Sequence, residues 1–246
     1  MKIQRNSNFS GQQKIVNEFS GIKRSSKFEM CEQVFEILTQ TRCENDEIRL
    51  QAEESLNSLK EQNIQELISM LIQIITNEYY NIDLTTYKSA VIFTWNLFPA
   101  SVQFIPVDQP HPFDIYSQEL VNQLLESTYL IMTNKIPTQP NIPAEVRNFA
   151  AYLFSRIASL HIHRDMNSNI IQRISASFAE SQTFEDIYPL SQATKIICEG
   201  YEPEVEELSS LLNVLFVHFS NPISPEITCE LLNVLAEIVT NLSTVI

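Results

Sequence analysis

The stretch AEVRNFAAYLFSRIASLHI, residues 144–162, carries the clearest helical pattern in the sequence. Its apolar side chains recur three or four residues apart, which is the spacing of one face of an α-helix. The residues on this face are Val146, Phe149, Ala150, Leu153, Ile157 and Leu160. Similar spacing runs outward in both directions, from residue 27 almost to the end of the chain, and it predicts an all-α fold.

Composition agrees with helices rather than strands. The chain has only 3 glycines in 246 residues, and two of them, Gly11 and Gly21, precede the first periodic segment. Strands joined by tight turns need more glycine, because turns often require backbone angles that only glycine adopts easily. The apolar content of 44% is enough for a sizeable core.

The periodic segments number ten and group into five antiparallel pairs. Prolines in two long connections, at 99–112 and 137–143, separate neighbouring segments where a helix cannot continue. The pairs start about 44 residues apart, within the range of HEAT and armadillo repeats. We therefore predict an α-solenoid of HEAT-type pairs in a right-handed superhelical stack, with an ordinary helical bundle as the alternative. The predicted pairs lie near 27–61, 63–98, 115–162, 167–200 and 204–243.

Residues 1–26 differ from the rest, and we predict a basic, disordered leader ahead of a repeat domain at 27–246. The first 27 residues hold six basic residues and one acidic residue, so this segment carries +5 of a net charge of −14. The remainder therefore carries about −19. An acidic body disfavours nucleic acid and suits basic protein surfaces, although such charge can also simply maintain solubility.

The sequence lacks the residue patterns of a catalytic or cofactor site, and we predict a protein that is not an enzyme and needs no cofactor. No glycine-rich loop is present to bind phosphates, and the four histidines form no nucleophile signature. His161, His163 and Asp165 come closest to a metal site, but residues two apart on a helix point to different faces. The four cysteines show no C-x-x-C spacing, which favours reduced thiols. No apolar run approaches the length of a membrane span.

Three segments carry a family resemblance. Residues 49–56 (RLQAEESL), followed by IQEL at 64–67, resemble the R-x-x-A-E-x-x-L core of the importin-β N-terminal region. Residues 90–97 (AVIFTWNL) are similar to its A-x-x-x-L-K-N segment, with Asn96 retained and Trp95 in place of the lysine. Residues 197–204 (ICEGYEPE) resemble the I-C-x-x-x-x-P-E junction between its fourth and fifth repeats. Ala52 and Ala90 would also suit any stack of closely packed helices.

The resemblance implies a nuclear transport receptor found in cytoplasm, nucleus and nuclear pore. It implies that the N-terminal repeats bind a Ran-type GTPase in its GTP form on a concave face lined by the second helix of each pair. It also implies weak or lost binding of Phe-Gly nucleoporins and of import cargo or adaptors, which use later repeats. Residues on second helices that would contact the GTPase are Glu47, Gln51, Glu54 and Asn96.

An interaction scaffold without a transport role is the alternative function. Solenoids normally end in repeats with a polar outer face. The last predicted helix instead carries Leu231, Leu235, Ile238 and Leu242. This pattern predicts a partner, a dimer or a continuation of the stack at this end.

Overall fold

The computed structural model describes residues 27–76, 83–98, 112–136, 141–163, 169–200, 205–221 and 224–243. All regular secondary structure in these ranges is helical, which confirms the all-α prediction. The predicted leader at 1–26 lies outside the described residues. Within the described ranges, no helix combines the length and apolar character needed to cross a bilayer.

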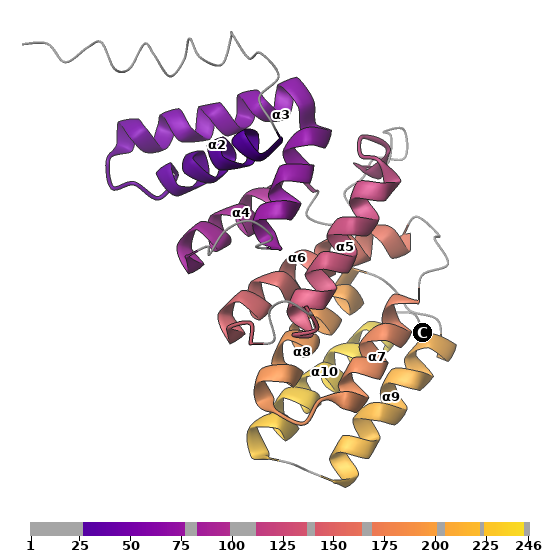
Figure 1. Ribbon diagram of the computed structural model, residues 1–246. Helices are drawn as coiled ribbons and strands as arrows, with labels where there is room; N and C mark the ends of the chain where they lie inside the picture. Colours follow the sequence, from indigo (N-terminus) through magenta and orange to yellow (C-terminus); the bar gives the residue numbers. More distant parts are fainter. Residues whose placement is uncertain are drawn as a thin grey trace, which may run out of the picture.

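The helices follow one another along an elongated stack (Figure 1). In chain order they are α2 (Lys27–Gln40), α3 (Asp46–Ile75), α4 (Leu84–Asn96), the short 3-10 helix η3 (Pro112–Asp114), α5 (Gln118–Met132), α6 (Ala144–His163), α7 (Ile170–Glu180), α8 (Phe184–Gly200), α9 (Val205–Ser220) and α10 (Pro225–Ser243).

Helix α3 consists of two helices joined at a kink, as the sequence predicted. Asn63 has a non-helical backbone (φ −157°, ψ 85°) inside the element. Its side-chain oxygen accepts a hydrogen bond from the backbone N–H of Glu66, and its amide donates to the Glu66 carboxylate. This reciprocal arrangement is that of a capping box, so Asn63 begins a new helix. The part before the kink completes the first pair with α2, and the part after it begins the second pair with α4.

The helices form two layers. The first-helix layer contains α2, the second part of α3, α5, α7 and α9, and the second-helix layer contains the first part of α3, α4, α6, α8 and α10 (Figure 1). Every substantial contact among the described helices joins elements one or two positions apart in chain order. A closed bundle would bring distant helices together, so the solenoid prediction is confirmed and the bundle alternative is wrong.

Neighbouring repeats are not packed equally closely. The backbones of α4, α6, α8 and α10 approach one another in sequence, as do those of α7 and α9, whereas those of α5 and α7 barely do. Long side chains bridge α5 and α7 instead: the Tyr129 hydroxyl lies 2.7 Å from Ser177 Oγ, and Arg173 reaches Glu126 at 2.7 Å.

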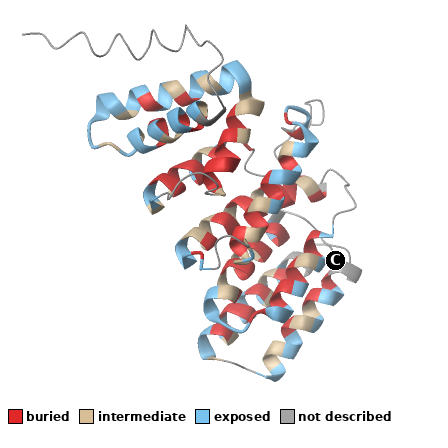
Figure 2. Ribbon diagram, in the orientation of Figure 1, coloured by how far each residue is buried: buried red, intermediate tan, exposed pale blue. Residues whose placement is uncertain are grey.

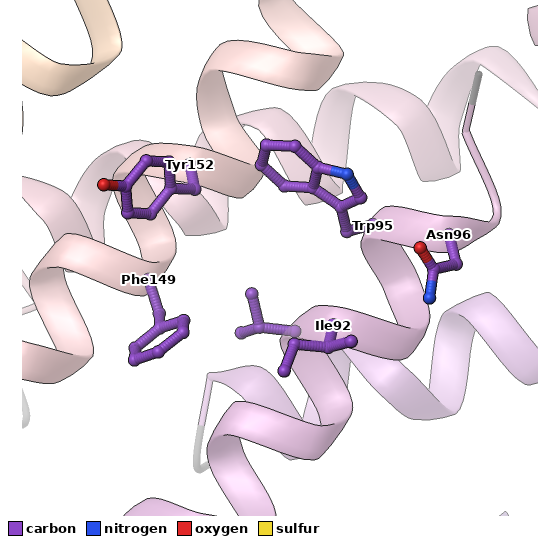
Figure 3. A pocket seen from close by; sticks show the side chains of 6 residues that line it. Ile92, Trp95, Asn96, Phe149 and Tyr152 are labelled. Carbon is purple, nitrogen blue, oxygen red and sulfur yellow. The ribbon is translucent and has the colours of Figure 1, made fainter. Parts of the chain in front are cut away.

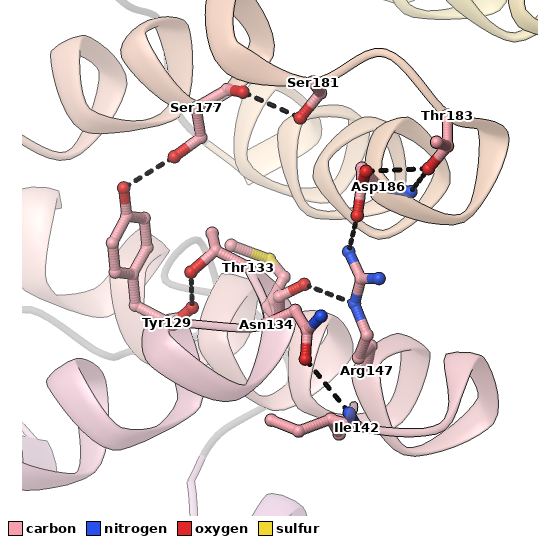
Figure 4. A network of polar contacts seen from close by, with 10 residues as sticks. Tyr129, Thr133, Asn134, Ile142, Arg147, Ser177, Ser181, Thr183 and Asp186 are labelled. Carbon is pink, nitrogen blue, oxygen red and sulfur yellow. Dashed lines mark hydrogen bonds and ion pairs between the residues drawn. The ribbon is translucent and has the colours of Figure 1, made fainter. Parts of the chain in front are cut away.

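A buried arginine joins three helices in the middle of the stack (Figure 4). The Arg147 side chain, on α6, donates from Nε to the carbonyl oxygen of Met132 at the end of α5. It also donates from Nη2 to the Asp186 carboxylate of α8 at 2.8 Å. Helix C-termini leave carbonyls unpaired, and Arg147 satisfies one of them. Thr183 caps the start of α8, because its hydroxyl accepts from the backbone N–H of Asp186 and donates to the Asp186 carboxylate.

Asn134 ends α5 in the left-handed conformation, with φ of 56°. The backbone N–H of Lys135 donates to the Leu130 carbonyl and that of Asn134 to Ile131, the two hydrogen bonds of a Schellman motif. The Asn134 side chain also accepts from the backbone N–H of Ile142 at 3.0 Å (Figure 4). One asparagine thus ends a helix and anchors the approach to α6.

Burial follows the predicted helix faces except at the two ends of the stack. Buried residues concentrate along α5–α8, while exposed positions predominate along α2 and the first part of α3 (Figure 2). Ile48, in the first turn of α3, is 39% exposed, although the apolar spacing of this helix predicts it on the same face as Ala52 and Leu56. Leu231 and Ile238 were predicted at an open end but are buried. The outer face of the last pair exposes other apolar residues: Phe216, Val217, Leu232 and Val239.

Candidate functional site

The first part of α3 carries an exposed polar stripe, which we call the acidic ridge: Glu47, Gln51 and Glu54. These residues are spaced by four and three, so they share one side of the helix. Ala52 and Leu56 occupy the opposite side and are buried. Asn45 caps the N-terminus of this helix, because its side chain accepts hydrogen bonds from the backbone N–H groups of Glu47 and Ile48. The predicted partner residues Glu47, Gln51 and Glu54 are thus presented together to solvent.

Asn96, the fourth predicted partner residue, lies elsewhere. It is the last residue of α4 and is exposed at the rim of a pocket between α4 and α6. The structure therefore places the four predicted residues on two surfaces of the second-helix layer rather than on one. The sequence placed all four residues in the second-helix layer. It did not show where along that layer each residue lies, because the course of the chain from α3 to α4 depends on the kink at Asn63.

The pocket, which we call the α4–α6 groove, is open and apolar (Figure 3). It has a volume of about 280 Å³. Trp95 packs edge-on against Tyr152, with ring centroids 6.2 Å apart. Figure 3 shows these two rings facing Phe149 and Ile92 across a shared space. The lining residues are Val91, Ile92, Trp95 and Asn96 of α4 and Phe149 and Tyr152 of α6.

Two cations flank the groove. The Arg156 guanidinium lies 4.8 Å from the centre of the Trp95 ring, and the Lys88 ammonium lies 5.3 Å from the centre of the Phe149 ring. Arg156 donates to the carbonyl oxygen of Phe98, and Lys88 approaches Glu145 at 3.5 Å. Partial burial lowers the pKa of Arg156, because removing water penalises the charged form. The Glu145 carboxylate offsets the charge of Lys88 beside this apolar pocket.

Sequence reasoning did not identify this groove. The apolar spacing of 84–98 and 144–162 predicts Trp95 and Phe149 on faces that pack in the core, whereas both are only partly buried. One signal was available, since Trp95 stands where the family resemblance expects a lysine. That replacement puts a large ring opposite Phe149 and Tyr152, and only the packing of α4 against α6 shows where the ring lies.

The segments that carry the family resemblance are mostly structural. Ala52, Leu56 and Ile197 are buried, as close helix packing requires. The Gln65 side chain pairs with backbone groups of Ile115 and Ser117, so it fastens the second repeat to the start of the third. Residues 201–204 of the last motif lie outside the described residues.

No group of three or more histidine, cysteine, aspartate or glutamate side chains within the described ranges is arranged to hold a metal ion. Of the candidate cluster, His161 is described and lies at the end of α6, with its ring 6.4 Å from Phe113. The His163 side chain and Asp165 lie outside the description.

The fold defines a class: an α-solenoid of HEAT-type helix pairs. Solved structures of this class resemble the chain. They include yeast importin-β, Kap95p (18% identity, TM-score 0.65, 89% of this chain), and the Kap95:Nup1 complex (19% identity, TM-score 0.67, 85% of this chain). A third is the structure in which Kap95p binding induces the switch loops of RanGDP to adopt the GTP-bound conformation (17% identity, TM-score 0.66, 87% of this chain).

These matches show that the chain has a karyopherin-β-like helical-repeat fold. The chain spans about a quarter of the length of the matched proteins, 24–25%. No protein-family model matches the sequence, and no curated protein matches it.

Proposed function

We propose that this chain is the GTPase-binding region of a nuclear transport receptor, acting by recognition rather than catalysis. The observation that carries the proposal is the likeness to Kap95p over 85–89% of the chain, including a Kap95p structure with RanGDP. The motif resemblance at 49–56, 90–97 and 197–204 points to the same family. The partner would be a Ran-type GTPase, bound preferentially in its GTP form.

The acidic ridge is the surface that we assign to the GTPase. Exposed carboxylates on a solenoid steer association with basic loops and reject partners of like charge. Glu47 and Glu54 supply charge, while Gln51 between them can donate and accept hydrogen bonds. Exposed charge pairs contribute modestly to stability, so the ridge is better suited to recognition than to holding the fold.

The test is a binding titration of the full chain against a Ran-type GTPase loaded with GDP or with a non-hydrolysable GTP analogue. We expect tighter binding of the GTP form, because a GDP-bound partner would first have to rearrange its switch loops. The double variant Glu47→Lys with Glu54→Lys should weaken binding by about tenfold or more, which equals about 1.4 kcal/mol.

The matched control is Glu32→Lys with Glu36→Lys. These residues are exposed on α2, in the same repeat but on the first-helix layer. The control makes the same change in net charge and should leave the affinity nearly unchanged. Equal binding of both nucleotide forms, no binding, or equal losses in the two double variants would reject the proposal.

Other parts of the transport cycle follow from the same proposal. A receptor of this kind would work in the cytoplasm, the nucleus and the nuclear pore. Phe-Gly nucleoporins, cargo and adaptors would bind weakly, because this chain matches only a quarter of Kap95p. Binding of a Phe-Gly peptide separates transport from a general scaffold, since only a transport receptor should show it.

A scaffold function is the second candidate, and the outer face of the last pair favours it. Phe216, Leu232 and Val239 are each about half exposed there, at 55%, 49% and 55%. Apolar surface of this kind often marks a protein–protein contact. If sedimentation shows a monomer at all concentrations and the GTPase titration succeeds, the scaffold alternative is rejected.

A further inference from the structure

We propose that the stack bends at the junction between its third and fourth pairs, where α5 separates from α7 while α6 and α8 stay in contact. This bending does not depend on GTPase binding. Each pair of a solenoid contacts only its neighbours, so one junction can change while the others keep their packing. At this junction the two sides of the stack are held together in different ways.

The α6–α8 side is closely packed, and the backbones of the two helices approach one another. Arg147 adds a buried ion pair, because its side chain is only 5% exposed and donates to Asp186 at 2.8 Å (Figure 4). Separating the two helices would expose apolar surface and break this ion pair, so this side resists opening. Both helices also carry small side chains, which allow helix axes to come close. The small residues that are fully buried are Ala151, Ser155 and Ala158 on α6 and Ser191 and Thr194 on α8.

The α5–α7 side is held by polar side chains instead, because the backbones of these two helices barely approach one another. Arg173 donates to the Glu126 carboxylate at 2.7 Å, and its guanidinium lies 3.9 Å from the centre of the Tyr129 ring. The Tyr129 hydroxyl lies 2.7 Å from Ser177 Oγ (Figure 4). Lys135, shortly after α5, donates to Glu180 at the end of α7, also at 2.7 Å. We call these six side chains the polar seam: Glu126, Tyr129, Lys135, Arg173, Ser177 and Glu180.

Opening the polar seam costs little, because water can replace most of what is lost. Both of its ion pairs face solvent, with the side chains of Glu126 and Glu180 exposed by 51% and 66%. Exposed ion pairs contribute little to stability, because solvent stabilises the separated charges. Tyr129 and Ser177 would exchange one hydrogen bond for hydrogen bonds to water. The junction can therefore open on the first-helix layer while the α6–α8 contact holds.

The next junction along the stack does not share this weakness. The backbones of α7 and α9 approach one another on the first-helix layer, and Ile174 of α7 and Leu211 of α9 are fully buried. Opening that side would expose apolar surface, which is unfavourable in water. Bending between α5 and α7 changes the angle between the first three pairs and the last two. A partner that contacts both parts would select one angle, because it binds that arrangement best.

The test measures the distance across the polar seam in the full chain by pulsed electron paramagnetic resonance. Spin labels are attached at Gln123→Cys on α5 and Gln172→Cys on α7, which are exposed positions outside the seam. The accessible cysteines are first removed by Cys43→Ser and Cys229→Ser, whereas the other two cysteines are buried. A reference chain carries Gln172→Cys with Asn213→Cys, an exposed position on α9, and so reports on the closely packed junction.

Salt provides the perturbation. Raising the salt concentration from about 0.01 M to about 1 M shortens the Debye length from about 30 Å to about 3 Å, which screens exposed ion pairs. We expect the mean distance between the labels on α5 and α7 to lengthen by about 2 Å or more, the scale of helix shifts in switching proteins, and its distribution to broaden. The reference distance between α7 and α9 should not change.

Two double variants of the labelled chain locate the cause. Glu126→Gln with Glu180→Gln removes both ion pairs of the polar seam and should give the long distance even at low salt. The matched control is Glu32→Gln with Glu36→Gln, which makes the same change in net charge at exposed positions on α2 and should leave the distance unchanged. All four positions are exposed, so both variants should fold, and circular dichroism checks this.

Three results would overturn the proposal. The first is a distance between α5 and α7 that does not respond to salt in the chain that keeps both ion pairs. The second is an equal response between α7 and α9, which would mean that the whole stack loosens. The third is the same distance in the two double variants at low salt, which would remove the polar seam as the element that closes the junction.

Discussion

The two ends of the stack have similar interiors and opposite outer faces. In the first pair, the side of α2 turned away from the core is polar and acidic, with Glu29, Glu32 and Glu36 exposed. In the last pair, the corresponding surface of α9 and α10 is apolar, with Phe216 and Leu232 exposed. The first end therefore has the polar outer face of a capping repeat, and the last end does not.

The difference separates two tasks that a repeat performs. Packing between the helices of a pair decides whether the repeat folds, and Leu38 and Leu215 are fully buried at the two ends. The outer face decides whether the repeat borders solvent or packs against another protein surface. Ile48 and Leu50 are exposed singly on α3 among polar residues, which is common on protein surfaces. Helices α9 and α10 instead expose four large apolar residues: Phe216, Val217, Leu232 and Val239.

The largest expected effect tests the similarity of the interiors. Leu38→Ala and Leu215→Ala should each lower the free energy of unfolding by about 2–5 kcal/mol, because each removes a buried side chain and leaves a cavity. Urea denaturation followed by circular dichroism measures both. Leu50→Ala, at an exposed position, should change it by less than about 0.5 kcal/mol. A large loss in only one of the two core variants would show that the ends are not equally packed.

The next effect concerns the cysteines of the last two pairs. Burial, with nearby Glu237 and Glu199, raises the pKa of the Cys198 thiol on α8 to about 12. Cys229 on α10 is exposed. Because the thiolate is the reactive form, iodoacetamide at pH 8 should modify Cys229 at least about a hundredfold faster than Cys198. Mass spectrometry of timed digests measures both rates, and equal rates would contradict the burial of α8 behind α10.

A smaller effect tests the outer faces directly. The unmodified chain should self-associate as its concentration rises, and Phe216→Glu with Leu232→Glu should weaken that association by about tenfold or more. Sedimentation velocity over a concentration series measures it. The matched pair Ile48→Glu with Leu50→Glu adds the same charge to the first repeat and should change nothing. If all three proteins behave alike, the contrast between the ends has no consequence in solution.

The smallest effect concerns Asp83, the N-cap residue of α4 in the second pair. Its carboxylate accepts hydrogen bonds from the backbone N–H groups of Thr85 and Thr86 at 2.8 and 3.0 Å. Asp83→Ala should cost about 1 kcal/mol at pH 7. Denaturant titrations at several pH values measure the difference, and Asp83→Asn, which keeps a capping oxygen, should cost less.

The pH dependence of this cap has a definite sign. Hydrogen bonds from Thr86 lower the pKa of Asp83 below its ordinary value of 3.8. A carboxyl group with a lowered pKa stabilises the folded state above the unfolded pKa, and this contribution is lost as the pH falls through the folded pKa. The stability difference between the unmodified chain and Asp83→Ala should therefore hold from neutral pH to about pH 4 and shrink below it. A difference that grows on acidification would contradict the assignment.

Much of the fold was predictable because its signals are local. The break at Asn63 follows from its side chain and Glu66 three residues later, and the spacing of apolar residues in 144–162 gives α6 almost to the residue. The candidate site was less predictable. The sequence placed Glu47, Gln51, Glu54 and Asn96 on second helices, and the structure adds that the first three share one side of α3. The sequence grouped Asn96 with them, because nothing local shows that Asn96 borders a groove made with another repeat.

The sequence by itself determined the helical segments of the described ranges, their pairing and the acidic character of the body, because helix periodicity and charge are properties of short segments. Only the tertiary structure decided which surfaces are available. It put Trp95 beside Tyr152 and Arg156, buried Leu231 while exposing its neighbour Leu232, and used Arg147 to join three helices. These outcomes depend on how one helix pair is rotated against the next, and that rotation is set by contacts between side chains far apart in the chain.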